Sequence, residues 1–392
     1  MGNTNNDSPA ILSLGFRPFF LSAALFSVIA MVHWLLTYSF NIDVGIHHIP
    51  PLYWHAHEMI FGYGMAVIAG FLLTAMTNWT GIKTVSGYPL LLMVVFWLSA
   101  RIMPFLAIES SLVIMLILDS LFFVYLVAVL SWPVIKTRQW KQVGILSKIL
   151  LLLIANVVFY LGALDKLDHG MRWGNYAGLY LILALILMMA RRVIPFFIEK
   201  GCGLDSPLTN WRWLDISSMI IFLLFMVSDI VYSSGKLTTT LAIGLALLHS
   251  LRLYHWHVKG IWSRPLLWVL YLAYSFITLG FFLKAAVYFF EISDFVALHA
   301  FAVGGIGLLT LGMMARVSLG HTGRQVDNPP PALLWLFALL TTAAVVRVIF
   351  PLIETQYYSL WVLSSQVMWI VAFSGFFVLY FPVLSTKNKH ED

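Results

Sequence analysis

The sequence predicts an all-α fold, a polytopic membrane bundle of about twelve transmembrane helices in one domain spanning residues 1–392. Two features of composition support this: 61% of the residues are hydrophobic and only 10% are charged, and the mean hydropathy is +0.89, values outside the range of ordinary soluble domains. Apolar stretches of about 20 residues, the length that crosses a bilayer core, also recur along the chain. The lipid bilayer is therefore the expected partner, and no nucleic acid is expected.

Twelve such stretches follow one another between turn residues and charge clusters. The clearest break is Asp327-Asn328-Pro329-Pro330-Pro331, which precedes the eleventh stretch. In order, the predicted spans are 16–38, 53–79, 88–107, 110–134, 145–166, 174–196, 213–233, 237–256, 265–289, 294–317, 331–352 and 357–383.

The Lys and Arg residues predict the orientation of these spans. Sixteen of the 23 fall on the side of the N-terminus, and only Lys166, Arg172 and Lys236 fall on the other side. Because basic loops stay in the cytoplasm, we expect both termini to be cytoplasmic and the protein to lie in the bacterial inner membrane.

Histidines carry the candidate chemistry, because a single cysteine excludes sites built from several thiolates. His57 and His299 lie near the outer ends of the second and tenth spans, each about one to two turns below the surface at about 1.5 Å per residue. We expect both to ligate the iron of one haem b. Glycines follow both histidines, and they would admit a flat cofactor or serve ordinary helix packing.

His55 lies two residues before His57, so on a helix the two side chains diverge by about 200° and cannot hold one metal together. The deeper His57 is favoured as the ligand. His55 is left as an interfacial hydrogen-bonding residue or as a ligand of something nearer the surface.

Three cations are predicted to lie inside the spans, in the outer half of the membrane. They are Arg101, Lys284 and Arg347, and charges at such depth are functional-site candidates. One hypothesis is that they bind the haem propionates. The alternative is that they pair with Asp119, Asp229 or Glu58 for structural reasons.

His249 is predicted near the middle of the eighth span, with Arg252 on the same helix face. It is either the ligand of a second metal or haem, where catalysis would occur, or a hydrogen-bonded core histidine. Glu58, Asp119 and Asp229 are candidate proton carriers, because ionisable groups in membranes often form relays.

Several segments together resemble the NnrS family. They are Gly15-Phe16-Arg17-Pro18-Phe19-Phe20, Trp54-His55-Ala56-His57-Glu58-Met59-Ile60-Phe61-Gly62-Tyr63, Gly70-Phe71-Leu72-Leu73-Thr74-Ala75, Arg101-Ile102-Met103-Pro104, Arg191-Arg192-Val193-Ile194-Pro195-Phe196-Phe197 and His299-Ala300-Phe301-Ala302-Val303-Gly304-Gly305. The resemblance implies a haem- and copper-associated membrane protein that protects denitrifying or nitrosatively stressed bacteria from nitric oxide.

The predicted arrangement is also similar to the catalytic subunit of haem–copper oxidases and nitric oxide reductases. The predicted membrane helices depart from these enzymes, because they lack the adjacent His-His pair and the His-x-x-x-Tyr motif of the second metal. A conventional binuclear centre is therefore not expected.

The leading hypothesis is a haem-dependent nitric oxide reductase that takes electrons from quinol, with copper or a second haem as a further cofactor. One alternative is a copper transporter or a repair factor for metal centres, with helices broken at Pro104 and Pro195. Another is a haem sensor or nitric oxide sink without catalysis.

Overall fold

The computed structural model describes residues 9–46, 48–106, 108–233 and 235–387, and every regular element in these ranges is helical. Twelve helical segments are long and apolar enough to cross a membrane. They are Phe16–Ser39, Pro51–Thr80, Tyr88–Phe105, Ser111–Thr137, Trp140–Ala163, Gly170–Cys202, Arg212–Tyr232, Lys236–Trp256, Pro265–Phe290, Asp294–His321, Ala332–Ile353 and Tyr358–Ser385. The predicted fold class, a twelve-span all-α membrane protein, is confirmed.

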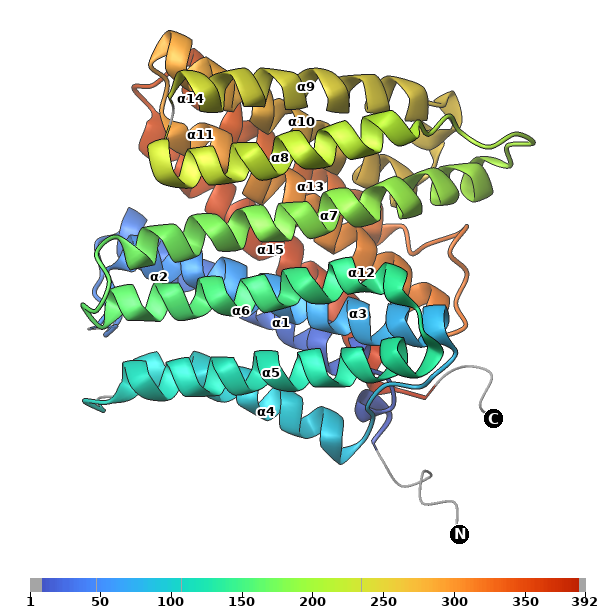
Figure 1. The fold of residues 1–392 in the computed structure, drawn as a ribbon, viewed down its shortest axis with the longest axis horizontal. Coiled ribbons are helices and arrows are strands. Elements are labelled where there is room, and N and C mark those ends of the chain that lie inside the picture. Colours follow the sequence, from blue (N-terminus) through green and yellow to red (C-terminus); the bar gives the residue numbers. More distant parts are fainter. Residues whose placement is uncertain (1–8, 47, 107, 234, 388–392) are drawn as a thin grey trace. The chain divides into compact units, whose positions relative to one another are not determined.

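Several spans consist of more than one helix (Figure 1). The α-helices are α1 (Phe16–Trp34), α2 (Pro51–His57), α3 (Met65–Thr80), α4 (Tyr88–Ile102), α5 (Ser111–Thr137), α6 (Val143–Ala163), α7 (Gly170–Cys202), α8 (Arg212–Tyr232), α9 (Lys236–Trp256), α10 (Pro265–Phe290), α11 (Asp294–His299), α12 (Leu308–His321), α13 (Ala332–Val348), α14 (Phe350–Ile353) and α15 (Tyr358–Ser385). Short 3₁₀ segments are η1 (Ala10–Leu12), η4 (Met103–Phe105), η5 (Trp140–Gln142) and η6 (Lys259–Ser263).

The observed spans differ little from the predicted ones, and the largest difference is in the sixth span, which ends at Cys202 instead of residue 196. The expected break at Pro104 is confirmed, because α4 gives way there to the 3₁₀ turn η4. The expected break at Pro195 is wrong, because α7 continues through it. A proline removes one backbone N–H from the helix, and a membrane helix tolerates this loss when its neighbours satisfy the freed carbonyl.

The described chain divides into two compact units. The first comprises residues 1–181, 317–324 and 373–392, and the second comprises residues 182–316 and 325–372. In the first unit α1 packs on α3, and α5 packs on both α4 and α6. In the second unit α9 packs on α8 and α10, and the segment Ala300–Gly307 packs on α10 and α13.

Glycines bring α6 very close to the start of α7 within the first unit. A Cβ atom added at Gly170 would lie 2.7 Å from the Cα of Gly162, and one added at Gly174 would lie 2.7 Å from the carbonyl oxygen of Ala155. Only residues without a side chain allow backbones to approach so closely.

Contacts at the helix ends agree with an even number of spans. Arg17, at the start of α1, donates hydrogen bonds from Nη1 to the carbonyl oxygens of Leu384 and Thr386, at the end of α15. The beginning of the first span and the end of the last span therefore lie on one side of the first unit.

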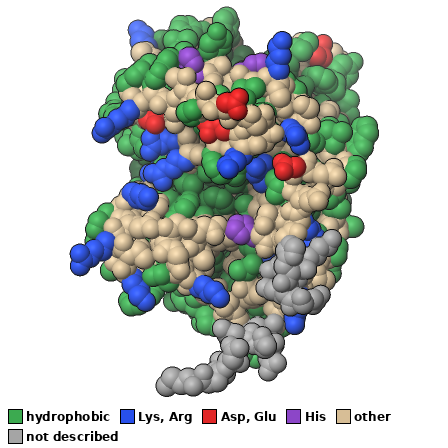
Figure 2. All heavy atoms as spheres, turned by 90° about the vertical axis from the view of Figure 1, so that its right-hand side faces the viewer, with side chains coloured by type: hydrophobic (Ala, Val, Ile, Leu, Met, Phe, Trp, Pro, Cys, Tyr) green, Lys and Arg blue, Asp and Glu red, His purple; other side chains and the backbone are tan. Residues whose placement is uncertain are grey.

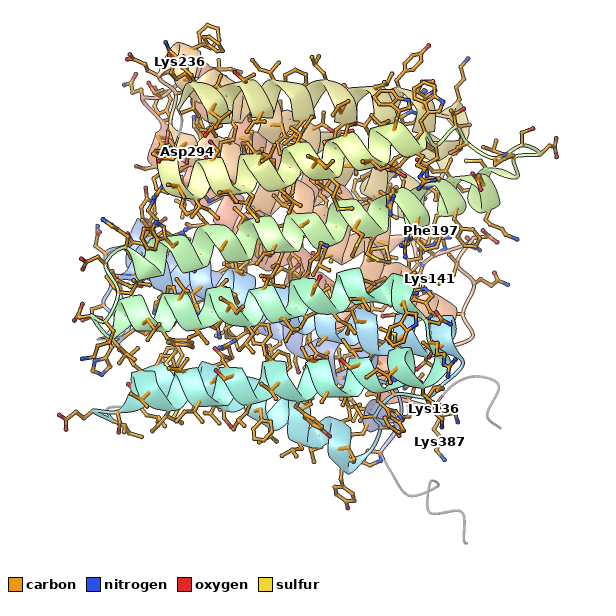
Figure 3. All side chains as sticks on the ribbon, in the orientation of Figure 1. Lys136, Lys141, Phe197, Lys236, Asp294 and Lys387 are labelled. Atoms are coloured by element: carbon orange, nitrogen blue, oxygen red, sulfur yellow. The ribbon has the colours of Figure 1, made fainter. Side chains whose placement is uncertain are left out.

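Figure 3 shows Lys136 and Lys141 at the end of the first unit where Lys387 lies. Within the second unit, Phe197 lies at the end opposite Lys236 and Asp294. Lys and Arg, which the positive-inside rule assigns to cytoplasmic helix ends, are common among the side chains that face the viewer in Figure 2.

Three segments have π-helical hydrogen bonding: η2 (Leu35–Ser39), η3 (Glu58–Gly64) and η7 (Ala300–Gly307). In the described part of the chain, each begins one or two residues after a histidine inside a span, namely His33, His57 and His299. A π-helix interrupts the regular pairing of backbone groups and is frequent at functional sites. The predicted outer ends of these three spans are therefore candidate functional regions.

Candidate functional site

A fully buried network of charged side chains lies in the first unit. Oε1 of Glu58 accepts a hydrogen bond from Nδ1 of His57 at 2.9 Å, and Oε2 forms an ion pair with Nε of Arg101 at 2.8 Å. Nη2 of Arg101 donates to both carboxylate oxygens of Asp119, at 2.7 and 2.6 Å. None of these four residues is more than 2% exposed. The structure therefore brings together four of the residues that the sequence singled out.

Two further groups complete this network. The hydroxyl of Tyr160 donates to Asp119 at 2.7 Å, and Oδ1 of Asn156 accepts from Nε2 of His57 at 2.8 Å. Each nitrogen of the His57 imidazole therefore has a hydrogen-bond partner. The guanidinium of Arg101 forms ion pairs with both carboxylates, Glu58 and Asp119.

Backbone carbonyls of the π-helical segment η3 accept hydrogen bonds from side chains in and beside this network. Arg101 donates to the carbonyl oxygen of Phe61 at 3.1 Å, and Nε1 of Trp97 donates to the carbonyl oxygen of Gly62 at 3.0 Å. A Cβ atom at Gly62 would lie only 2.8 Å from a carboxylate oxygen of Glu58. Glycine is required here because the charged side chains occupy the space beside the backbone.

The second unit contains a similar buried pairing at its predicted outer side. Nζ of Lys284 on α10 donates to both oxygens of Asp229 on α8, at 3.0 and 2.8 Å, and pairs with Asp294 at the start of α11 at 2.7 Å. The side chains of Lys284 and Asp229 are inaccessible to solvent, whereas that of Asp294 is 24% exposed. Pairing with carboxylates is the alternative to propionate binding that the sequence offers for the embedded cations, and Arg101 and Lys284 do form such ion pairs.

His249 on α9 is the other buried histidine with candidate chemistry. Its Nδ1 lies 2.6 Å from the hydroxyl of Tyr274, and its ring stacks on Phe281 at 5.5 Å between centroids and 14° between planes. The residue is 1% exposed, and Nε2 has no hydrogen-bond partner. A buried ring nitrogen without a partner is rare and is an available ligand atom.

Arg252, one turn after His249, connects α9 to a carboxylate at the predicted inner side. Its Nη2 lies 2.9 Å from Asp215 and donates to Oγ of Ser218 at 3.2 Å. Asp215 also accepts from Arg191 at 2.8 Å. Arg252 is 2% exposed and is neutralised by this carboxylate.

The remaining predicted residues lie elsewhere. Nδ1 of His299 donates to the carbonyl oxygen of Phe295 at 2.6 Å, and His55 stacks on Trp34 at 4.6 Å. Nη2 of Arg347 donates to the hydroxyl of Tyr358 at 3.2 Å. His57 belongs to the first unit and His299 to the second, so the hypothesis that both ligate one iron stays a prediction, as does the propionate role of the three cations.

Sequence reasoning missed the neutral partners of these groups, which are Asn156, Tyr160 and Tyr274, and it gave no role to Asp215. Their only sequence signal is a polar residue inside an apolar span, and Tyr and Asn are too common in such positions to be informative alone.

The histidines differ in their fit to a haem iron. In the observed arrangement both nitrogens of His57 have a hydrogen-bond partner, so neither is available to an iron without breaking a hydrogen bond. In His249 one nitrogen is held by Tyr274 and the other is unpartnered, which is the pattern of a metal-ligating histidine with a supporting hydrogen bond. Within the residues that the structure describes, no three or more His, Cys, Asp or Glu side chains are placed to hold one metal ion. A haem, which needs only one or two protein ligands, fits His249 better than a multi-ligand metal site does.

The family model described as "NnrS protein" matches residues 10–387, nearly the whole chain. No curated protein matches the chain.

Proposed function

Because the chain belongs to the NnrS family, a membership that fits a role in the response to nitric oxide stress, we propose that it is a haem-containing membrane protein that binds and reduces nitric oxide. We assign the iron of the nitric oxide site to His249. The family membership and the twelve spans support the coarser part of this proposal, and the surroundings of His249 support the finer part.

The observation that carries the assignment is the asymmetry of the His249 ring. When Nδ1–H donates to the hydroxyl oxygen of Tyr274, the lone pair is on Nε2, the nitrogen that has no partner. The stacked ring of Phe281 fixes the imidazole plane. A bound haem would supply an iron with an open position for nitric oxide.

The chain's own residues contribute shielding and access. Phe222, Phe225 and Phe281 contact one another at 5.5–6.3 Å between centroids, and Phe281 lies against His249. These rings exclude water from the predicted mid-membrane position of His249. Nitric oxide is small and apolar, so it can reach such a position through the lipid.

Reduction also requires protons, and Glu58, Asp119 and Asp229 are the proposed carriers. Each forms an ion pair with a cation inside the membrane, so each is held in a defined position. His57 is proposed to act with Glu58, since their side chains are hydrogen-bonded.

The proposal predicts the behaviour of the purified protein toward nitric oxide. After anaerobic reduction, titration with nitric oxide should convert a haem absorption band to that of a nitrosyl complex with matching magnetic resonance. Excess nitric oxide with a quinol as reductant should be consumed over many turnovers. Binding in a single turnover would contradict reduction but not binding, and protein that contains copper and no haem would favour the metal-handling function instead.

A further inference from the structure

A cluster of aromatic rings occupies the predicted outer end of the first unit, apart from the charge network. It is formed by adjacent His-Trp and Trp-His pairs of two helices. His33 of α1 contacts Trp54 of α2 at 4.2 Å between ring centroids, and Trp34 stacks on His55 at 4.6 Å with an angle of 10° between planes. The two pairs thus interlock.

Polar atoms in this cluster have no hydrogen-bond partner. They are both ring nitrogens of His33, Nε1 of Trp54 and Oγ1 of Thr37, and all are shielded from solvent. His33 is 5% exposed and Trp54 is 1% exposed. Leaving one such group unsatisfied costs about 1–3 kcal/mol, so their concentration in three residues indicates that a polar ligand satisfies them.

The local backbone is also irregular. Thr37 lies one turn beyond His33 in the π-helical segment η2, and a wider helix turns its residues away from regular packing. The ring of Phe105 in η4 lies near both His33 and Trp54, with ring centroids 6.1 and 6.3 Å apart, and Phe105 is 44% exposed. The half-exposed ring of Phe105 is the cover that would move when a ligand enters from the lipid.

The chemistry of the unpartnered atoms defines the ligand. The indole N–H of Trp54 can only donate a hydrogen bond, and the hydroxyl of Thr37 can donate or accept one. A neutral His33 donates at one ring nitrogen and accepts at the other. The indole and imidazole rings favour a flat aromatic partner. A flat ring with oxygens that both donate and accept, delivered through the membrane, is the headgroup of a quinol.

A metal ion suits this cluster less well. An indole N–H repels a cation, and in the described ranges no three His, Cys, Asp or Glu side chains converge on one point.

We propose that His33, Thr37 and Trp54 bind the headgroup of a quinol that donates electrons to the protein. Oxidation of the quinol to the quinone breaks its two O–H bonds and releases two protons, which His33 would accept one after the other, and two electrons, for which a bound haem would serve as the one-electron acceptor. The electron acceptor in this scheme rests on the proposed function. The binding site itself does not.

The test measures quinone binding and so needs no haem. The full-length protein in detergent is titrated with decylubiquinone and, separately, with menadione, and bound quinone is measured after gel filtration; the two probes distinguish a benzoquinone from a naphthoquinone. Trp54→Phe keeps the aromatic ring and removes the donor, so it should weaken binding about threefold to tenfold, the effect of one hydrogen bond. His33→Leu should weaken it further.

The control is Trp132→Phe, because this tryptophan is 62% exposed on α5 and lies outside the cluster. The control should bind quinone as the wild type does. Absence of saturable binding, or equal binding by the wild type and Trp54→Phe, would overturn the site. Saturable binding by a protein without haem would instead refute the proposed function and leave the quinol site standing.

Discussion

Replacing Arg101 by leucine is expected to lower the free energy of unfolding by about 3–5 kcal/mol, the usual cost of breaking a buried ion pair by removing one partner. The substitution removes the donors to Glu58 and Asp119 and to the carbonyl oxygen of Phe61. Two carboxylates then remain inside the membrane without the arginine that pairs with both of them. Reversible unfolding by dodecyl sulfate in mixed micelles, followed by circular dichroism, measures the change.

Two comparison variants separate charge from packing. Arg212→Leu removes an exposed arginine at the start of α8 and should change the free energy of unfolding by less than about 1 kcal/mol, as is usual for surface charges. Adding Glu58→Gln and Asp119→Asn to Arg101→Leu should recover part of the loss, because no buried carboxylate is then left without its arginine. If the triple variant is less stable than Arg101→Leu, charge imbalance is not the cause.

The second large effect is expected at Lys284. Lys284→Met leaves Asp229 and Asp294 facing each other across the position of the ammonium group, so we expect the free energy of unfolding to fall by about 3–5 kcal/mol. The same dodecyl sulfate titration applies.

Lys148 is the matched control for this variant. It also lies within a span, but its Nζ donates only to the carbonyl oxygen of Gly144, at 3.1 Å. Lys148→Met should therefore be close to neutral. The double variant Lys284→Met, Asp229→Asn should be more stable than Lys284→Met alone. Equal losses for Lys284→Met and Lys148→Met would show that the buried cluster in the second unit contributes no stability.

The spans could be predicted closely from the sequence, because the bilayer imposes a length on every apolar helix. The sixth span was the least accurate, since Pro195 and the arginines before it resembled a helix end. Within a membrane a helix can continue through such residues when the backbone and the charges find partners, and Arg191 finds Asp215.

The sequence also predicts that the buried charges lie inside the spans, but it does not predict which carboxylate pairs with which cation. Asp119 and Asp229 were anticipated as alternatives to haem propionates for Arg101 and Lys284, and the structure shows both pairs. Which carboxylate meets which cation depends on the rotation of each helix about its axis, which hydropathy alone does not determine in spans that are apolar on all sides.

The surroundings of the candidate ligand histidines could not be predicted from the sequence either. His57 was favoured for its depth, and the structure surrounds it with Glu58 and Asn156, a residue 99 positions away. For His249 the sequence leaves two roles open, a metal or haem ligand and a hydrogen-bonded core histidine, and the observation that favours the first is its unpartnered Nε2 opposite the contact with Tyr274. Hydrogen-bond partners across helices are tertiary information that residue spacing does not contain.

The most direct test of the central claim is the absorption spectrum of reduced His249→Ala before and after addition of nitric oxide, compared with the wild type and Tyr274→Phe. The account predicts that His249→Ala loses the haem component that binds nitric oxide, and that Tyr274→Phe keeps it with a shifted band, because only the supporting hydrogen bond is removed. A His249→Ala protein with the haem content and nitrosyl spectrum of the wild type would contradict the assignment.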